Sequence, residues 1–445
     1  MRHRSSWSID DVVNRYYPER IQQYGDLIEI LEAIGEENPE AAVRHASTVR
    51  GLANSFKNNK GMLAGLQRYD LLAQKRAQEA AVREYLATDK KAAAEYGHVL
   101  DEMAGLYADQ LSFASQQGAL SRMAYFATSL RSAYTVVKWA REQEKDDLER
   151  DKGYQARDED TLRKRLKLAE RRYAEVSDKA IIGYYLEALG AMDGEKLASL
   201  KGVEDVGAFV DGLYAGTSVT DPEKLLAMFG KTSKELESMK DPMLDYAVRV
   251  LDDDERFDAR DEVFEGAMSS LSPKMLELRA MVSDTPLYPD ANSTMRLSVG
   301  SVRGYSPRDA VEYDPFTTLD GVVEKATGEE PFHAPGRLLD LAAKGDYGQW
   351  ADPELGDVPV CFLSSDDVTG GNSGSPVLNG NGDLIGLVFD VNLEAVSSDY
   401  QFIPAITRTI HVDSRYIMYI VDRFGGATEL LNELTVVGGT EGAMR

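Results

Sequence analysis

The pattern of apolar residues changes once along this chain, near Ser283, and the change restricts the fold to a helical part followed by a β-rich part. From about residue 8 to about 283, apolar residues recur at steps of three and four, which is typical of one face of an α-helix. Pairs of Asn or Asp with Pro at 38–39, 221–222 and 241–242 predict helix starts, because a capping side chain precedes Pro in the first turn. The highly charged stretch 141–172 predicts a long, exposed helical arm.

After Ser283, prolines become frequent and the apolar runs become short. Alternating or β-branched runs predict strands at 295–299, 358–363, 376–378 and 384–389. The residues between the last two runs read NGNGD, a hairpin turn of the Asn-Gly type. Helices are predicted at 414–424 and 428–434. We therefore predict an α+β protein with a large all-α domain at residues 1–285, followed at 286–445 by a β-barrel that a C-terminal helix closes.

Charge and composition exclude several classes of function. The 75 acidic and 50 basic residues give a net charge of -25, which repels the phosphates of nucleic acids. No apolar run is long enough to span a membrane. Cys361, the single cysteine, lies in an apolar run and is predicted to be an inert core residue. The acidic block 252–255 lacks the alternating ligands and central glycine of a calcium loop, so we predict that it is a solvated helix face and that the chain holds no metal.

The segment with the clearest chemical meaning is 369–377, which reads TGGNSGSPV just before the predicted hairpin. A sharp glycine-rich turn of this kind can aim the amides of Gly371 and Ser373 at one point, where they stabilise a negatively charged oxygen. The hydroxyl of Ser373 is then placed to act as a nucleophile. Two alternatives stay open: a plain glycine-rich turn, and Ser375 in place of Ser373 as the reactive serine.

Several motifs together resemble the bacterial dipeptidyl-peptidase 7 and 11 family. They are GGNSGSPVLN at 370–379, GLVFD at 386–390, VDSRYI at 412–417, YPDANST at 288–294, GYSP at 304–307 and ANSFKN at 53–58. The resemblance extends over essentially the whole chain. The short GNSGSP string alone is also similar to glutamyl endopeptidases, so the set of motifs, and not that string, points to the family.

The resemblance implies a chymotrypsin-like double barrel with a helical domain inserted between its halves, and removal of dipeptides from free peptide N-termini. It implies that Ser373 is the nucleophile and that the amides of Gly371 and Ser373 form the oxyanion hole. Asp390 and Asn54 would bind the α-ammonium group of the substrate, which a carboxylate and a carbonyl oxygen suit well. The family also implies a homodimer without a cofactor, located in the periplasm or at the cell surface.

Two departures from the family pattern affect function. The residue after Asp390 is Val391, whereas the family places Gly there for hydrophobic and Arg for acidic substrate side chains. Val391 cannot neutralise an acidic side chain and would narrow an open pocket, so the side-chain preference stays open. Leu393 likewise stands where family members often have Trp.

The second departure concerns the catalytic base. The family takes its histidine and the orienting carboxylate from a first barrel that precedes the helical domain, and none of the five histidines here matches that position. We therefore expect an N-terminally truncated chain without a signal peptide, inactive or nearly so by itself. The alternative is a non-catalytic peptide-binding or scaffold protein with the same fold.

Overall fold

The computed structural model describes residues 4–287, 294–329 and 331–437 of the chain. These residues form two compact units. The helical unit comprises Ser5–Leu63 and Asp70–Leu287, while the sheet unit comprises Ala64–Tyr69 and the residues after Leu287, together with the N-terminal end. Most of the 288–294 motif and His3 lie outside the described residues. The predicted α+β class is confirmed.

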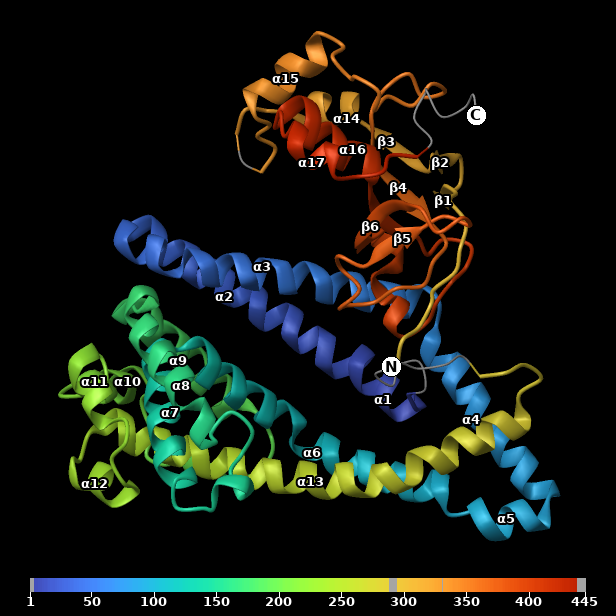
Figure 1. Cartoon of the computed structure of the whole chain (residues 1–445). Helices are drawn as coiled ribbons and strands as arrows, with labels where there is room; N and C mark the ends of the chain where they lie inside the picture. The colour runs from blue at the N-terminus through green and yellow to red at the C-terminus, as the bar shows by residue number, and fades with distance from the viewer. Residues whose placement is uncertain (1–3, 288–293, 330, 438–445) are drawn as a thin grey trace. The chain divides into compact units, whose positions relative to one another are not determined.

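Thirteen α-helices are described up to the end of the helical unit (Figure 1). They are α1 (Ser6–Asp11), α2 (Tyr17–Glu37), α3 (Pro39–Arg68), α4 (Leu71–Thr88), α5 (Lys90–Tyr96), α6 (Val99–Phe126), α7 (Thr128–Glu142), α8 (Glu159–Ala169), α9 (Glu175–Ala191), α10 (Val206–Tyr214), α11 (Pro222–Met228), α12 (Ser233–Ser238) and α13 (Pro242–Val282). A π-helical turn at Val12–Tyr16 connects α1 to α2. Among the described helices, none combines the length and the hydropathy of a membrane-spanning segment.

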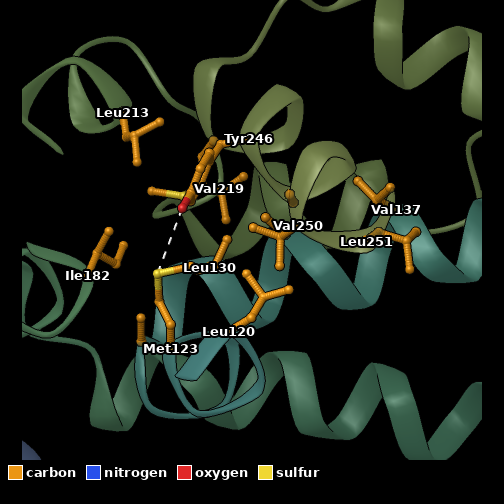
Figure 2. Close-up of a cluster of buried hydrophobic side chains, with 14 of the residues drawn as sticks. Leu120, Met123, Leu130, Val137, Ile182, Leu213, Val219, Tyr246, Val250 and Leu251 are labelled. Carbon is orange, nitrogen blue, oxygen red and sulfur yellow. Dashed lines mark hydrogen bonds between the residues drawn. The ribbon is translucent and has the colours of Figure 1, made fainter. Parts of the chain in front are cut away.

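The main core of the helical unit lies where α6, α7, α9 and α13 meet, and Figure 2 shows its side chains. Leu120 and Met123 of α6 pack there with Leu130 of α7. The hydroxyl of Tyr246, on α13, donates a hydrogen bond to Sδ of Met123 at 3.7 Å, so this buried tyrosine keeps a polar partner.

The three predicted helix starts are confirmed. α3, α11 and α13 begin at Pro39, Pro222 and Pro242, each directly after a capping residue. Asp241 accepts hydrogen bonds from the amides of Met243 and Leu244, which would otherwise lack a partner at the first turn of α13.

The predicted helical arm at 141–172 is wrong. α7 ends at Glu142, whose buried carboxylate accepts hydrogen bonds from Nζ of Lys145 and the amide of Asp151, both at 2.7 Å. These bonds fold the chain back into a loop before α8 begins. Leu162 and Leu166 of α8 are buried in the core, so the charges of this stretch cover only the outer side of a packed helix.

The sheet unit contains five antiparallel strands in the order β3-β4-β7-β6-β5, and a separate hairpin of β1 and β2. The strands are β1 (Tyr305–Arg308), β2 (Val311–Tyr313), β3 (Phe316–Thr318), β4 (Pro359–Ser364), β5 (Pro376–Leu378), β6 (Leu384–Val391) and β7 (Thr409–Asp413). The helices are α14 (Leu319–Lys325), α15 (Gly336–Ala343), α16 (Ser414–Tyr419) and α17 (Thr428–Asn432), which gather beside β3 (Figure 1).

The predicted hairpin is confirmed, since β5 and β6 pair through Pro376 with Leu387 and Val377 with Gly386. The predicted helix at 414–424 is α16 continued by the π-helical turn Ile420–Phe424. Cys361 is half-buried in β4, and burial raises the pKa of its thiol, as an inert cysteine requires.

The predicted strand at 295–299 is wrong. These residues have no regular secondary structure and no described strand pairs with them. The first bridge from this segment to a strand joins Val302 to Ser364. Met295, Leu297 and Val299 are 93%, 85% and 87% exposed. The alternating apolar residues of this segment are therefore exposed to solvent, and no described strand covers them.

Candidate active site

The predicted nucleophile lies in the loop that connects β4 to β5. A tight turn forms at its centre, where the amide of Thr369 donates to Oδ1 of Asn372 at 3.1 Å and the amide of Asn372 donates to the carbonyl of Thr369 at 3.2 Å. The carbonyl of Asn372 then accepts the amide of Ser375 at 2.9 Å. Thr369 and Ser375 are therefore both hydrogen-bonded to Asn372, the residue directly before Ser373.

Two glycines in this loop have a left-handed backbone conformation. Gly371 has φ of +100° and Gly374 has φ of +84°, values that side chains disfavour. These angles give the chain a sharp turn on either side of Ser373, as a glycine-rich stretch predicts.

The amides of residues 371–375 divide into two groups. Those of Asn372, Gly374 and Ser375 donate to backbone carbonyls. The amides of Gly371 and Ser373 donate no hydrogen bond to any described residue, and the exposed hydroxyl of Ser373 has no such partner either. These three groups are available to a ligand.

The loop is bonded to β6 just beyond the hairpin. The amide of Gly374 donates to the carbonyl of Val388 at 2.7 Å, and the amide of Val388 donates to the carbonyl of Ser375 at 3.0 Å. Asp390 lies two residues further along β6, so its Cα and that of Ser373 are no more than about 16 Å apart. An extended dipeptide and the two side chains can bridge such a distance.

A β-bulge sets the direction of the Asp390 side chain. Val388 lies opposite His411 of β7, but Asp390 lies opposite Ile410, so Phe389 is the extra residue. Because neighbouring residues of a strand point to opposite faces, the bulge places Asp390 on the face away from Val388. Val388 is accordingly buried on one face of the sheet, whereas Asp390 is exposed on the other.

The carboxylate of Asp390 is largely uncommitted. Its Oδ1 accepts the amide of Val391 at 2.8 Å, and it forms no ion pair with any lysine or arginine that the structure describes. Val391 lies half-buried opposite Thr409, whose side chain is fully buried. Asn54 is exposed on α3 in the helical unit, and its side-chain amide has no hydrogen-bond partner in the described part of the chain.

The four described histidines are bound elsewhere or exposed. His45 contacts Ser177 at 3.1 Å, His98 contacts Lys274 at 3.3 Å, and His333 is exposed. His411 is fully buried, and its Nε2 lies 2.7 Å from Oγ of Ser364. Burial lowers the pKa of His411, so the ring is neutral at pH 7. None of the four contacts Ser373.

Sequence reasoning missed the polar contacts that hold the nucleophile loop. The first is the hydrogen bond from the amide of Thr369 to Oδ1 of Asn372. The second is the hydrogen bond from Oγ1 of Thr369 to Oδ1 of Asp399. An Asn three residues after a Thr in a glycine-rich stretch is a turn signal that points to the first contact. The second joins residues 30 positions apart, which no local pattern predicts. No cluster of three or more metal-ligating side chains occurs in the part of the chain that the structure describes.

Comparison with known proteins identifies the same family as the motifs do. Residues 1–436 match the family described as peptidase S46. The chain belongs to the peptidase S46 family. Its predicted resemblance to dipeptidyl-peptidases 7 and 11 is thereby confirmed, because relatives are named dipeptidyl-peptidase 7 and Asp/Glu-specific dipeptidyl-peptidase, and a solved structure of similar fold is DPP11.

Two peptidase S46 relatives show how far the likeness extends. An Asp/Glu-specific dipeptidyl-peptidase of Shewanella putrefaciens is 34% identical over 452 residues, which cover 95% of this chain and 61% of the relative. Dipeptidyl-peptidase 7 of Porphyromonas endodontalis is 31% identical, with 99% of this chain and 53% of the relative covered. This chain therefore spans between about half and three fifths of the length of these two relatives.

The fold is similar to that of a solved structure. The crystal structure of Porphyromonas endodontalis DPP11 in complex with the dipeptide Arg-Glu matches with a TM-score of 0.77 at 23% identity, over 97% of this chain and 62% of that one. The same protein in an alternate conformation matches with a TM-score of 0.65. The likeness confirms the predicted fold class.

Proposed function

We propose that this chain carries the nucleophile of a serine-type dipeptidyl-peptidase, with Ser373 in that role. The observation that carries the proposal is the set of three uncommitted groups in one loop: the hydroxyl of Ser373 and the amides of Gly371 and Ser373. A peptidase of this type needs a hydroxyl to attack the carbonyl carbon and donors to hold the oxygen as it becomes negative. Membership of the peptidase S46 family supports the same reaction class.

In the proposed reaction, Oγ of Ser373 forms a bond to the carbonyl carbon of the second substrate residue. The peptide bond then breaks, and the leaving amine takes a proton. Water hydrolyses the resulting ester, which frees the dipeptide and restores the hydroxyl of Ser373.

The N-terminal end of the substrate would be held by Asp390. Its exposed carboxylate has no cationic partner among the described side chains, so it can pair with an α-ammonium group without losing another contact. Crystal structures of DPP11 contain the dipeptides Arg-Glu and Arg-Asp, which supports a peptide ligand for this fold. The part of Asn54 in binding the ammonium stays a prediction.

Catalysis by this chain alone is expected to be weak. The proton of Ser373 must pass to a base, and none of the four described histidines contacts that serine. We propose that Ser373 is acylated slowly or not at all unless a base is supplied.

Val391 bears on the side chain that the enzyme accepts. It is half-buried and uncharged, so it offers no counter-charge to an acidic substrate side chain. We expect Val391→Arg to increase the binding of dipeptides that end in Glu relative to those that end in Leu.

A fluorophosphonate probe tests the nucleophile, because it reacts covalently with an activated serine. We expect slow labelling at Ser373, located by mass spectrometry of peptides, and its loss in Ser373→Ala. Ser375→Ala is the matched control, since this serine is only two residues away, and it should label as the unsubstituted chain does.

Labelling at Ser375 instead would refute the assignment of the nucleophile. Rapid hydrolysis of dipeptidyl-coumarin substrates that disappears in Ser373→Ala would refute the proposed impairment. Both outcomes are read on the same preparations.

The second candidate is a peptide-binding protein without catalysis. The absence of histidine contacts at Ser373 among the described residues favours it. It predicts that a dipeptide binds to the chain, as measured by calorimetry, and that no ester forms on Ser373. Acetylation of the dipeptide's amino group, or the substitution Asp390→Asn, should abolish this binding. A homodimer and a periplasmic or cell-surface location are proposed from the family alone, and sedimentation would test the first.

A further inference from the structure

Asn372, the residue before the nucleophile, uses three of its polar groups within the loop. Its side-chain oxygen accepts the amide of Thr369, its amide donates to the carbonyl of Thr369, and its carbonyl accepts the amide of Ser375. It is half-buried, and no hydrogen bond of its side-chain nitrogen is recorded within the described chain. The oxygen is therefore the group through which this side chain acts.

Three of the five amides at residues 371–375 are used, two of them in bonds with the turn and one in a bond to β6. The amides of Asn372 and Ser375 are used by the turn itself, and that of Gly374 is used by Val388. The amides of Gly371 and Ser373, on either side of Asn372, are left without a partner in the described structure. Two free amides that flank a fixed residue can serve as a pair of donors to an oxyanion, and the less they must move on binding, the more they stabilise it.

The turn is also tied to the rest of the sheet unit. Oγ1 of Thr369 donates to Asp399, the last residue of the short helix Leu393–Asp399 that follows β6. At the other end, the Gly374–Val388 bond joins the loop to β6 itself. Asn372 thus closes a turn whose two ends are fixed to separate segments.

We propose that Asn372 is a positioning residue that keeps the amides of Gly371 and Ser373 free and aligned before a substrate binds. It acts through the backbone, because its own side chain bonds to Thr369 and not to a reacting atom. The catalytic meaning of this role rests on the proposed function, whereas the ordering of the loop does not.

Hydrogen exchange of the loop amides tests the ordering directly. With glycine and serine labelled with nitrogen-15, NMR reports Gly371, Ser373, Gly374 and Ser375 separately. In the unsubstituted chain we expect the last two amides to exchange more slowly than the first two. In Asn372→Ala the protection of Gly374 and Ser375 should fall about fivefold to tenfold, the effect of losing one hydrogen bond.

Two further variants separate this role from a general loss of structure. Asn372→Asp keeps an oxygen that can accept the amide of Thr369, so it should restore the protection that Asn372→Ala loses. Asn379→Ala is the matched control: Oδ1 of Asn379 closes the next turn by accepting the amides of Asn381 and Asp383 at 2.9 and 3.0 Å. Its loss should leave the amides at 371–375 unchanged.

The dipeptide Arg-Glu serves as the probe for the link to catalysis, since its carboxylate can occupy an oxyanion site. We expect it to shift the Gly371 and Ser373 signals of the unsubstituted chain, and to shift them at least about fivefold less in Asn372→Ala at the same concentration. Unchanged exchange of Gly374 and Ser375 in Asn372→Ala would overturn the positioning role. No shift by the dipeptide in the unsubstituted chain would count against the proposed function, while the exchange pattern would still decide the role of Asn372.

Discussion

Asp258 lies on α13 among charges that do not balance. Burial and the nearby Asp254 raise its pKa to about 6, and Lys138 opposes the shift only in part. Asp254 already accepts a hydrogen bond from the hydroxyl of Tyr134, and Lys138 pairs with Asp151 at 2.7 Å. Asp258 therefore has no cation of its own to compensate its charge.

We expect Asp258→Asn to stabilise the helical unit at neutral pH. A carboxyl whose pKa is raised on folding binds its proton more tightly in the folded state, so stability is highest below about pH 4 and falls as the pH rises to about 6. Because Asp258 is exposed and solvent screens its charge, we expect a gain of at most about 1 kcal/mol at pH 7.

Thermal unfolding between pH 4 and pH 7 measures this effect. The substitution should remove the fall in stability over that interval and leave the value at pH 4 unchanged. A parallel decline in both proteins would show that other groups cause it. Asp193→Asn, at an exposed site, is a suitable control.

Much of the site could be predicted at the residue level, because its signals are local. Gly371 and Gly374 surround Ser373 in the sequence, and both have the backbone angles that a sharp turn needs. The contact of Thr369 with Asp399 and the burial of His411 against Ser364 could not be predicted. Both depend on how distant segments pack, and short-range patterns carry no information about that.

At the level of elements, the end of α3 is held close to the segment that follows β6. A Cβ atom added to Gly65 would lie 2.2 Å from Oγ of Ser397 and 2.6 Å from its Cβ. Both residues belong to the sheet unit, and Ser397 is buried. Only glycine fits this contact without a shift of the helix or of the Leu393–Asp399 segment.

Gly65→Ala should therefore destabilise the sheet unit by about 1–3 kcal/mol, as overpacking of a close contact does. Gly51 on the same helix is a matched control, because a Cβ there meets nothing within 4 Å. Gly51→Ala should stabilise α3 by up to about 1 kcal/mol through helix propensity. Urea unfolding of both variants measures the difference.

A second substitution checks the cause. Ser397→Gly removes both crowded atoms, so it should restore most of the stability lost in Gly65→Ala. If Gly65→Ala proved as stable as Gly51→Ala, the close contact would have no energetic weight.

Elements were predicted well where the sequence contains its own stop and start signals. Asp241 before Pro242 marks a helix start, and the Asn-Gly turn marks the β5–β6 hairpin. The arm at 141–172 failed because the bonds of the buried Glu142 outweigh local helix propensity. The strand at 295–299 failed because a strand needs a partner, and alternation alone does not supply one.

At the level of the whole molecule, charge and exposed apolar surface act in opposite directions. The net charge of -25 keeps copies apart at low ionic strength. Met295, Leu297 and Val299 expose three apolar side chains at alternate positions of one short segment, which favours association once salt screens the charge.

We expect light scattering at micromolar concentration to rise with salt, and Leu297→Lys to reduce that rise at least about twofold. The free energy of unfolding should change by no more than about 0.5 kcal/mol, because the side chain is exposed. Leu148→Lys is the control: Leu148 is 92% exposed but belongs to the helical unit. Equal effects of both substitutions would show that charge, and not the stretch around Leu297, controls association.

The extra residue at Phe389 also determines where this hairpin can change in length. An added residue at 379–383 falls in the turn, outside every paired position, so it would leave Ser373 and Asp390 in place. A residue added or removed between Val388 and Asp390 would turn the carboxylate to the opposite face. Protein engineers can therefore graft a tag or an epitope at the tip of the hairpin, but must leave the length of β6 untouched.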